Sequence, residues 1–155
     1  MIGPVPVALI VLFGLLTFGF VRVCSVPMSK WSLEGDYVCI RLNGWASVFA
    51  LRRRVEVDLG AIRSITVTEN RPRVPWLRIK GTGAGFVTAG LFGRKGQHEF
   101  WLTTCRRRPV VLIDCTRGDL ARLVLDVAEP EALCREVVRA QEAAGGASGP
   151  EQSPP

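Results

Sequence analysis

His98 is the only histidine in the 155-residue sequence, so catalysis that needs an imidazole would have to depend on it. Such catalysis also requires a nucleophile and an orienting acid placed around the histidine. No G-x-S-x-G motif presents a nucleophilic serine. The paired carboxylates Glu56 and Asp58 share one side of a predicted strand, where charge is normally solvated. The sequence therefore predicts no catalytic residue.

Glycines are concentrated between Gly81 and Gly96, a composition that lets backbone N–H groups approach phosphates. The dinucleotide-binding spacing fails because Phe86 stands where the third glycine is required, and no Gly-Lys-Ser/Thr sequence occurs. Glycines between short strands are typical of turns and bulges, where they permit a positive φ without steric strain. We therefore expect no nucleotide or other cofactor.

The cysteines form no metal-binding or disulfide pattern. The chain has five, at positions Cys24, Cys39, Cys105, Cys115 and Cys134. None are spaced as C-x-x-C, and an odd number leaves at least one thiol unpaired. We expect small buried apolar residues, with no metal site. Cys105 and Cys115 would face each other across a predicted hairpin, but a reducing compartment disfavours a disulfide there.

Two runs of arginine are the candidates for a binding site. They are Arg52-Arg53-Arg54 and Arg106-Arg107-Arg108. Three long cations at a hairpin tip reach a phosphate or an acidic patch on a partner. The alternative is a solvated turn, or charge that helps to hold the domain on the inner side of a membrane.

Basic residues outnumber acidic ones seventeen to seven between Arg22 and Arg117, which suits an anionic partner. The charge is not accompanied by a recognisable nucleic-acid-binding module, and aromatic residues are few, so we expect no nucleic acid.

The segment from Ile2 to Val21 has no charged residue and is long enough to cross a lipid bilayer. A helix of about 20 residues spans the roughly 30 Å of hydrocarbon. A cleaved signal would show a basic start and small residues before a cleavage site, and neither is evident. The sequence predicts a single-pass transmembrane helix over residues 2–23, in the cell (plasma) membrane.

Basic residues near the predicted span indicate its orientation. Arg22, Lys30 and Arg41 follow it, whereas only the α-amino group precedes it. The positive-inside rule then places the soluble domain in the cytoplasm. The anionic inner leaflet would attract each nearby basic residue by about 1 kcal/mol.

The rest of the chain is predicted to be one mainly β domain. We expect a juxtamembrane linker over residues 24–34, the domain with a C-terminal helix over residues 35–144, and a disordered tail over residues 145–155. Asn43-Gly44 predicts a hairpin turn that leads into a strand at residues 47–51. A second hairpin is expected to pair residues 99–104 with residues 110–115.

The four tryptophans are expected to serve packing or an interface. Trp45, Trp76 and Trp101 fit a core or a protein interface better than a ligand cage. Trp31 follows the predicted span by about ten residues, which suits the level of the lipid headgroups.

The order of these segments resembles the bacterial pleckstrin-homology-like (PH-like) domains of small single-span membrane proteins. The similar stretches are Leu59-Gly60-Ala61-Ile62-Arg63-Ser64-Ile65, Arg78-Ile79-Lys80-Gly81-Thr82-Gly83, Thr88-Ala89-Gly90-Leu91-Phe92 with Phe100-Trp101, Val110-Val111-Leu112-Ile113, and residues 122–133. The resemblance implies an antiparallel β-sandwich or partial barrel of two nearly orthogonal sheets, capped by the C-terminal helix. It implies binding and not catalysis, and it carries over no phosphoinositide-binding motif.

The sequence thus predicts a non-enzymatic, membrane-tethered binding or scaffolding module. Its partners would be the bilayer, through Ile2 to Val21, an unidentified protein, and anionic lipid headgroups. The alternative is a small accessory or regulatory subunit of a larger membrane complex, in which Gly14 and Gly19 pack the helix against another span. An enzyme is the third alternative.

Overall fold

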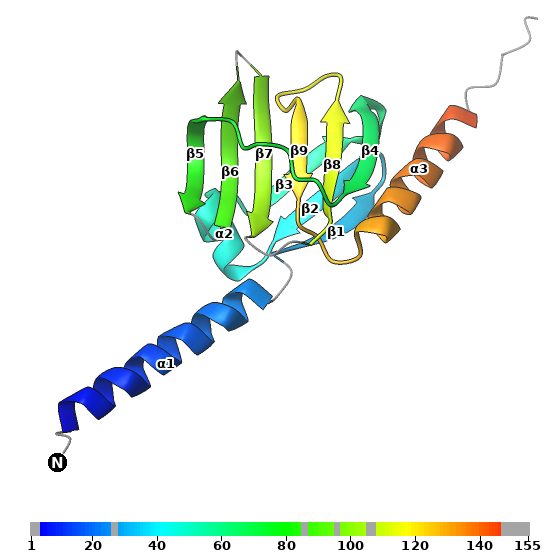
Figure 1. Cartoon of the computed structure of the whole chain (residues 1–155). Helices are drawn as coiled ribbons and strands as arrows, with labels where there is room; N and C mark the ends of the chain where they lie inside the picture. The colour runs from blue at the N-terminus through cyan, green and yellow to red at the C-terminus, as the bar shows by residue number, and fades with distance from the viewer. Residues whose placement is uncertain (1–3, 26–27, 85–86, 95–96, 105–107, 147–155) are drawn as a thin grey trace, which may run out of the picture.

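The computed structural model of the chain describes residues 4–25, 28–84, 87–94, 97–104 and 108–146. Figure 1 shows a long helix that leads into a body made mainly of strands. The elements are α1 (Pro4–Ser25), β1 (Ser29–Glu34), β2 (Tyr37–Leu42), α2 (Gly44–Ala50), β3 (Arg54–Asp58), the 3₁₀ turn η1 (Leu59–Ala61), β4 (Ile62–Thr68), β5 (Leu77–Ala84), β6 (Val87–Arg94), β7 (Gln97–Thr104), β8 (Val110–Cys115), β9 (Arg122–Leu125) and α3 (Pro130–Gly146).

α1 is a 22-residue helix that extends away from the body of the protein (Figure 1). Its side chains are described from residue 8 to residue 19, and the large apolar ones among them are 54 to 71% exposed. Over the part of the chain that the structure describes, no helix has both the length and the hydropathy that a membrane crossing requires.

The strands form two sheets, as expected for a mainly β domain with a C-terminal helix. The small sheet has three strands in the order β1-β2-β3, and the large sheet has six in the order β4-β8-β9-β7-β6-β5. In Figure 1 the small sheet lies behind the large one, and α3 packs beside β4.

β1 occupies residues 29–34, within the segment predicted to be a linker, so a strand forms there in place of the linker. It pairs with β2 along its full length, from Ser29 opposite Leu42 to Glu34 opposite Tyr37. Trp31 and Leu33 pack against the core, so the segment has an apolar face to bury. A positive φ of 59° at Gly35 permits the tight turn between the two strands.

The predicted turn at Asn43-Gly44 and the strand at residues 47–51 are wrong, because this segment forms α2. Asn43 is extended at φ −89° and precedes the helix, whereas a two-residue hairpin turn of this type would need a positive φ there. Ala46 and Ala50, four residues apart, are buried on one side of α2. Their spacing is that of one face of a helix, and this face packs against the core.

The predicted hairpin between β7 and β8 is also wrong, since β9 lies between them. β9 pairs antiparallel with β8 and parallel with β7, so the expected all-antiparallel arrangement fails at one pair. Leu123, Val124 and Leu125 of β9 are fully buried. A strand that is apolar on both faces is stable only in the middle of a covered sheet, which explains its position.

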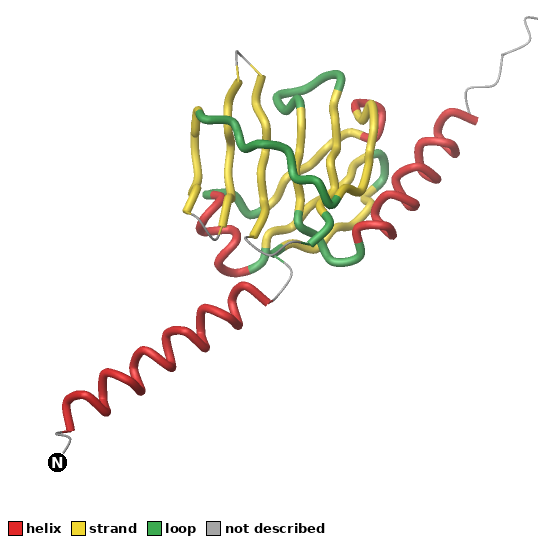
Figure 2. Tube along the Cα trace, viewed as in Figure 1, coloured by secondary structure: helices red, strands yellow, loops and turns green. Residues whose placement is uncertain are grey.

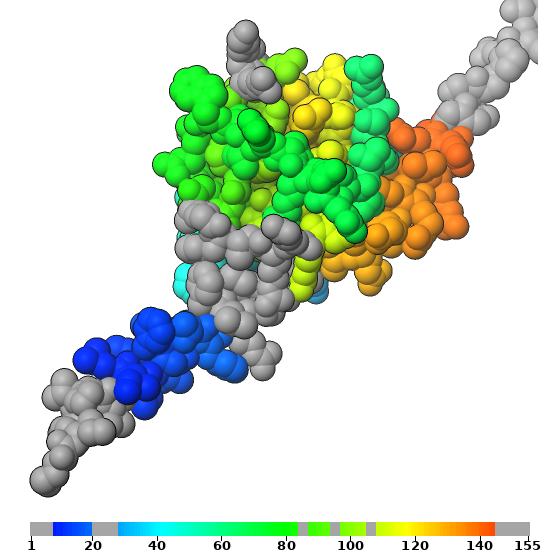
Figure 3. Space-filling view, in the orientation of Figure 1, coloured from blue at the N-terminus to red at the C-terminus, as the bar shows by residue number. Residues whose placement is uncertain are grey.

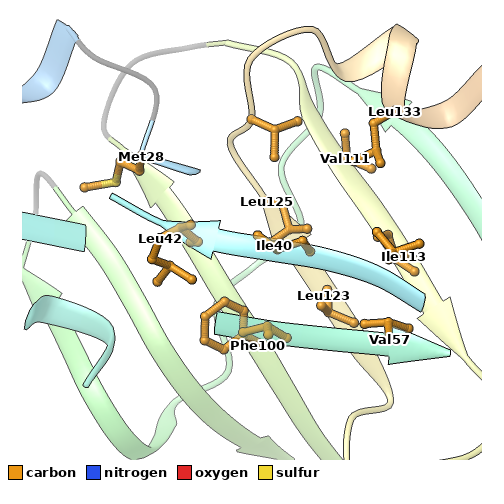
Figure 4. Close-up of a cluster of buried hydrophobic side chains, with 14 of the residues drawn as sticks. Met28, Ile40, Leu42, Val57, Phe100, Val111, Ile113, Leu123, Leu125 and Leu133 are labelled. Atoms are coloured by element: carbon orange, nitrogen blue, oxygen red, sulfur yellow. The ribbon is translucent and has the colours of Figure 1, made fainter. Parts of the chain in front are cut away.

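The main core lies between the two sheets (Figure 4). Phe100, Ile113 and Leu125 come from the large sheet and Ile40 from the small sheet, and all are at most 1% exposed. Leu133 of α3 is fully buried against the same core. The side of α3 that carries this residue therefore closes one flank of the sandwich.

The segment of residues 69–76 connects β4 and β5, which are the opposite edges of the large sheet. Five strand spacings of about 4.8 Å make the edges roughly 24 Å apart. Nine residue steps reach only about 30 Å, so the segment must be extended. Pro72 and Pro75 favour that conformation.

Figures 2 and 3 show this segment running across the outer face of the large sheet. On that face Phe92, Trp101, Val110 and Val124 form a second buried apolar cluster. The guanidinium of Arg71 donates to the backbone carbonyls of Thr104 and Arg108, which fixes the segment to the end of β7 and the start of β8.

A close approach of two backbones explains part of the glycine-rich stretch. Gly81 and Gly90 face each other on β5 and β6 with φ values of +116° and +141°. A Cβ atom on Gly90 would lie 2.2 Å from the carbonyl oxygen of Lys80. The pairing register shifts between Arg78 and Lys80, next to these glycines. Gly81, Gly83 and Gly90 lie within β5 and β6, whereas the sequence predicted turns or bulges between the strands.

Substitution of Gly90 by alanine should therefore destabilise the protein. We expect a loss of about 2 kcal/mol or more in the free energy of unfolding, because a methyl group meets backbone and φ is strained. Gly83→Ala is the matched control, since its Cβ would meet only Phe92 at 3.9 Å. Urea denaturation of the full chain in detergent measures both, and equal effects would contradict the close approach.

Candidate functional site

Basic and acidic residues are concentrated at opposite ends of the small sheet. Lys30, Arg41 and Arg54 lie opposite one another at the end where β1 begins. Glu34, Tyr37 and Asp58 form the corresponding row at the other end. Arg52 and Arg53 immediately precede β3, so they extend the first row. We call the end that carries Lys30, Arg41, Arg52, Arg53 and Arg54 the basic end.

The structure separates the first predicted arginine run into two environments. Arg52 and Arg53 are exposed after α2. Arg54 lies in β3 and pairs with Glu34 at 2.8 Å and with Glu56 at 2.5 Å. Arg52 and Arg53 make no ion pair among the described residues, and a contact of this run with an anion stays a prediction.

The second predicted run is only partly described. Arg106 and Arg107 lie outside the described residues. Arg108 is half-buried, and its backbone carbonyl accepts a hydrogen bond from Arg71. The prediction of a contact surface at this run stays a prediction.

A groove of about 560 Å³ runs beside β3. We call it the β3 groove. Its lining residues are Tyr37, Arg52, Arg54, Glu56, Val57, Asp58, Ala61, Cys115, Arg117, Gly118, Asp119 and Leu120. They include both ends of β3 and the turn between β8 and β9, so the groove follows the strand from one end to the other.

One edge of β3 has no neighbouring strand among the described residues, because β3 is the last strand of the small sheet. The backbone N–H of Leu42 donates to Arg53, and that of Leu59 donates to Asp36. Antiparallel pairs alternate between bonded and non-bonded positions. Residues 53, 55, 57 and 59 therefore bond toward β2, and Arg54, Glu56 and Asp58 direct their backbone groups outward.

Ion pairing organises the solvent face of the small sheet. The pKa of the Glu34 carboxyl is lowered, mainly by a hydrogen bond from Ser32 and also by Arg54 and Arg41. The pKa of the Arg54 guanidinium is raised, mainly by its hydrogen bond to Cys39 and then by Glu34 and Glu56. Both groups therefore stay charged at neutral pH.

The groove contains one thiol, that of Cys115. Burial, together with the adjacent Asp114, raises the pKa of this thiol. A raised pKa leaves the thiol protonated at neutral pH, whereas a catalytic cysteine needs a stabilised thiolate. Cys115 is therefore suited to packing and not to nucleophilic attack.

The other candidates for chemistry lie apart from one another. His98 is exposed on β7, opposite Gly93. The Asp58 carboxylate accepts from the N–H of Gly60 at 2.8 Å and lies 3.5 Å from Arg117. Among the described residues, no three or more His, Cys, Asp or Glu side chains are grouped as a metal ion would require.

The cysteines of the described chain differ from the prediction in part. Cys39 is buried as expected, whereas Cys115 and Cys134 are half-buried, and all three are free thiols. The side chain of Cys24 and the whole of Cys105 lie outside the described residues, so the cross-hairpin pair with Cys105 is not described.

The tryptophans divide into two groups. Trp101 is 1% exposed and belongs to the outer-face cluster, as expected of a core residue. Trp31 packs against the core and donates its indole N–H to the carbonyl of Ala128 at 3.3 Å, so it is not free to sit among headgroups. Trp45 and Trp76 are 63 and 88% exposed, which a core role does not explain.

Sequence reasoning did not find the β3 groove. Tyr37, Arg117 and Asp119 line it from segments that are far apart in the chain. The alternation of Arg54 to Leu59 predicted a strand with one wet face but could not show that this strand is an edge. That property depends on which strands pair, and the alternation within one strand does not determine its neighbours.

The chain matches no protein-family model, no curated protein and no solved structure. The resemblance to PH-like domains stays a prediction from short sequence stretches. The β3 groove and the basic end are the features from which a function is inferred.

The raised pKa of Cys115 has a measurable consequence. Alkylation of Cys115 by iodoacetamide at mildly alkaline pH should be slower than alkylation of the same residue in the urea-unfolded chain, because less thiolate is present. The alkylation rate of Cys115 in the folded chain should still increase with pH in a range where the rate in the unfolded chain no longer changes. Peptide mass spectrometry of quenched samples measures both rates. Faster labelling in the folded chain would point to an activated nucleophile.

Proposed function

We propose that the protein is a membrane-tethered, non-enzymatic binding module whose β3 groove holds an extended segment of a protein partner. The observation that carries this proposal is the open edge of β3, where Arg54, Glu56 and Asp58 direct backbone groups into a groove. An extended peptide adds to such an edge through main-chain hydrogen bonds, and the flanking side chains give specificity.

The charges around the groove favour a polar partner segment. Arg52 and Arg54 lie at the start of β3, and Asp58, Asp119 and Arg117 lie around its end. Opposite charges in a partner would fix its direction and register in the groove. Val57, which is largely buried, and Leu120 are apolar residues of the lining.

The tether in this proposal is α1, with residues 2–21 in the hydrocarbon of the cell membrane and the β domain on its cytoplasmic side. The proposal is supported by the uncharged sequence of this stretch and by the exposure of its large apolar side chains, from Leu9 to Phe18. Exposed apolar surface on this scale is characteristic of a segment that meets lipid or another helix. A tether raises the effective concentration of the module near membrane partners, so weak contacts suffice.

We also propose that the domain is a variant of the PH-like fold. Two packed sheets with a C-terminal helix at one flank support this assignment. The parallel β7–β9 pair departs from the expected antiparallel sandwich.

Strand addition is testable with a proline. Glu56→Pro removes an outward N–H and no bond to β2, so the fold should persist while main-chain pairing with a partner is lost. A photo-crosslinking amino acid in place of Tyr37, in the full chain in its own cells, should give a discrete crosslinked protein. Adding Glu56→Pro should reduce the amount of that crosslinked product at least tenfold, as measured on denaturing gels.

Two controls accompany this test. Glu56→Gln removes the same charge but keeps the N–H, so it should retain the product. The photo-crosslinker at Trp76, which is exposed and lies outside the groove lining, should not give the product. Equal products from the Glu56→Pro and Glu56→Gln chains would contradict strand addition.

A second candidate is the accessory subunit, in which α1 itself recognises another span. A Cβ on Gly14 or Gly19 would meet no atom within 4 Å, so both positions leave room for a neighbouring helix. In this case specificity would reside in α1 and not in the β3 groove.

Exchange of residues 2–21 for an unrelated apolar span separates the two candidates. If the groove provides recognition, the exchanged chain should keep the Tyr37 crosslink, and both chains should stay in the membrane pellet after alkaline carbonate extraction. Loss of the crosslink on exchange would favour the subunit. Recovery of the intact native chain in the aqueous fraction would contradict the tether.

A further inference from the structure

α2 presents apolar side chains to solvent where a surface helix normally presents polar ones. Trp45 and Val48 are 63 and 60% exposed, and Leu51, which caps the helix, is 60% exposed. Its buried side consists of Ala46 and Ala50. The sequence Gly44–Ala50 contains no charged residue. An exposed apolar face of this kind indicates contact with lipid or with another protein surface.

α2 lies next to the point where α1 joins the domain. The N–H of Asn43, just before α2, donates to the carbonyl of Met28 at 2.9 Å. Met28 is buried, and it follows the last residue of α1, Ser25, by three positions. Three residues span at most about 10 Å, so the end of α1 must lie close to the start of α2. Figure 1 shows the two helices at the same end of the body.

The residues around α2 are basic. Arg52 and Arg53 follow the helix directly, and Lys30 lies in the neighbouring row of the small sheet. These three make no ion pair among the described residues. No acidic residue occurs from position 28 to 31 or from 41 to 54. Of the acidic residues in the strands of the small sheet, Glu34 and Asp58 lie at the opposite end and Glu56 lies in the middle of β3. The side chains of Glu34 and Glu56 reach Arg54, and that of Glu34 also reaches Arg41.

We infer that α2 is a second membrane contact, with Trp45 and Val48 inserted at the headgroup level of an anionic bilayer and with Arg52 and Arg53 on lipid phosphates. This inference rests on the proposed tether and adds to it a fixed orientation of the domain. Tryptophan is favoured at this level because its ring is apolar while its N–H reaches water. Flanking cations attract the anionic leaflet.

A lipid surface fits this face better than a protein partner. The apolar face, the unpaired cations and the end of α1 all meet at one end of the domain, and a bilayer that holds α1 must pass close to that end. Trp76 has even greater exposure, but it lies before β5, at the end of that strand far from α2 in Figure 1. Trp45 is therefore expected to contact lipid, whereas Trp76 is not.

Fluorescence quenching by brominated phospholipid in nanodiscs tests this distinction on the full chain. Bilayers of phosphatidylcholine with phosphatidylglycerol, brominated near the headgroups, should quench part of the tryptophan emission. Trp45→Phe should remove the quenched component, whereas Trp76→Phe should increase its share. An unchanged quenched fraction in Trp45→Phe would overturn the inference. Protection of Trp45 from iodide quenching, without quenching by the brominated lipid, would also overturn it, because Trp45 would then be covered by protein and not by lipid.

The cations are tested in the same discs. Arg52→Gln with Arg53→Gln should reduce quenching of Trp45 in anionic discs to the level found in phosphatidylcholine alone. Equal quenching of the native chain in the two lipids would overturn the role of these arginines. Far-ultraviolet circular dichroism confirms that each variant is folded.

The tether and the α2 contact fail in different ways. A chain without a tether would not float with the discs in a density gradient. A chain that floats with the discs but keeps Trp45 unquenched has its tether, and then only the α2 contact is wrong.

Discussion

The burial of β9 between β7 and β8 is the constraint on which the rest of the structure depends. Its apolar residues point to both faces of the large sheet, and Leu123, Val124 and Leu125 are fully buried. A sheet with such a strand at its centre must be covered on both sides. The small sheet covers one face, and the crossing segment of residues 69–76 passes over the other (Figures 1 and 2).

The two covers leave different surfaces free. The small sheet buries one face and keeps the other in water, so the charges on that face remain exposed. Its last strand, β3, also has one edge without a neighbouring strand among the described residues. The crossing segment is thin and is anchored by Arg71, so the outer face of the large sheet is closed with few residues. The proposed binding edge, β3, belongs to the sheet that keeps one face in water.

The sequence predicted those features that local patterns control. A strict alternation predicted the wet and dry faces of β3, and the spacing of Leu133 and Val137 predicted α3. Local patterns failed at residues 47–51, where α2, with Ala46 and Ala50 buried on one side, forms in place of the predicted strand. They also failed for pairing: β7 and β8 are adjacent in sequence, and no local signal indicates that β9 inserts between them. The β3 groove was missed because its lining residues come together from segments that are far apart in the chain.

The proposed contacts together constrain how a partner would approach. β3 begins at the basic end, next to α2 and the end of α1, and it ends at Asp58, near Arg117. If α2 rests on the bilayer, β3 leads away from the lipid, and the β3 groove with it. A partner segment bound along β3 would then enter the groove at the membrane surface and leave it several residues farther from the bilayer. Such a path suits the juxtamembrane segment of another membrane protein better than an internal loop of a soluble one, because only the former starts at the bilayer.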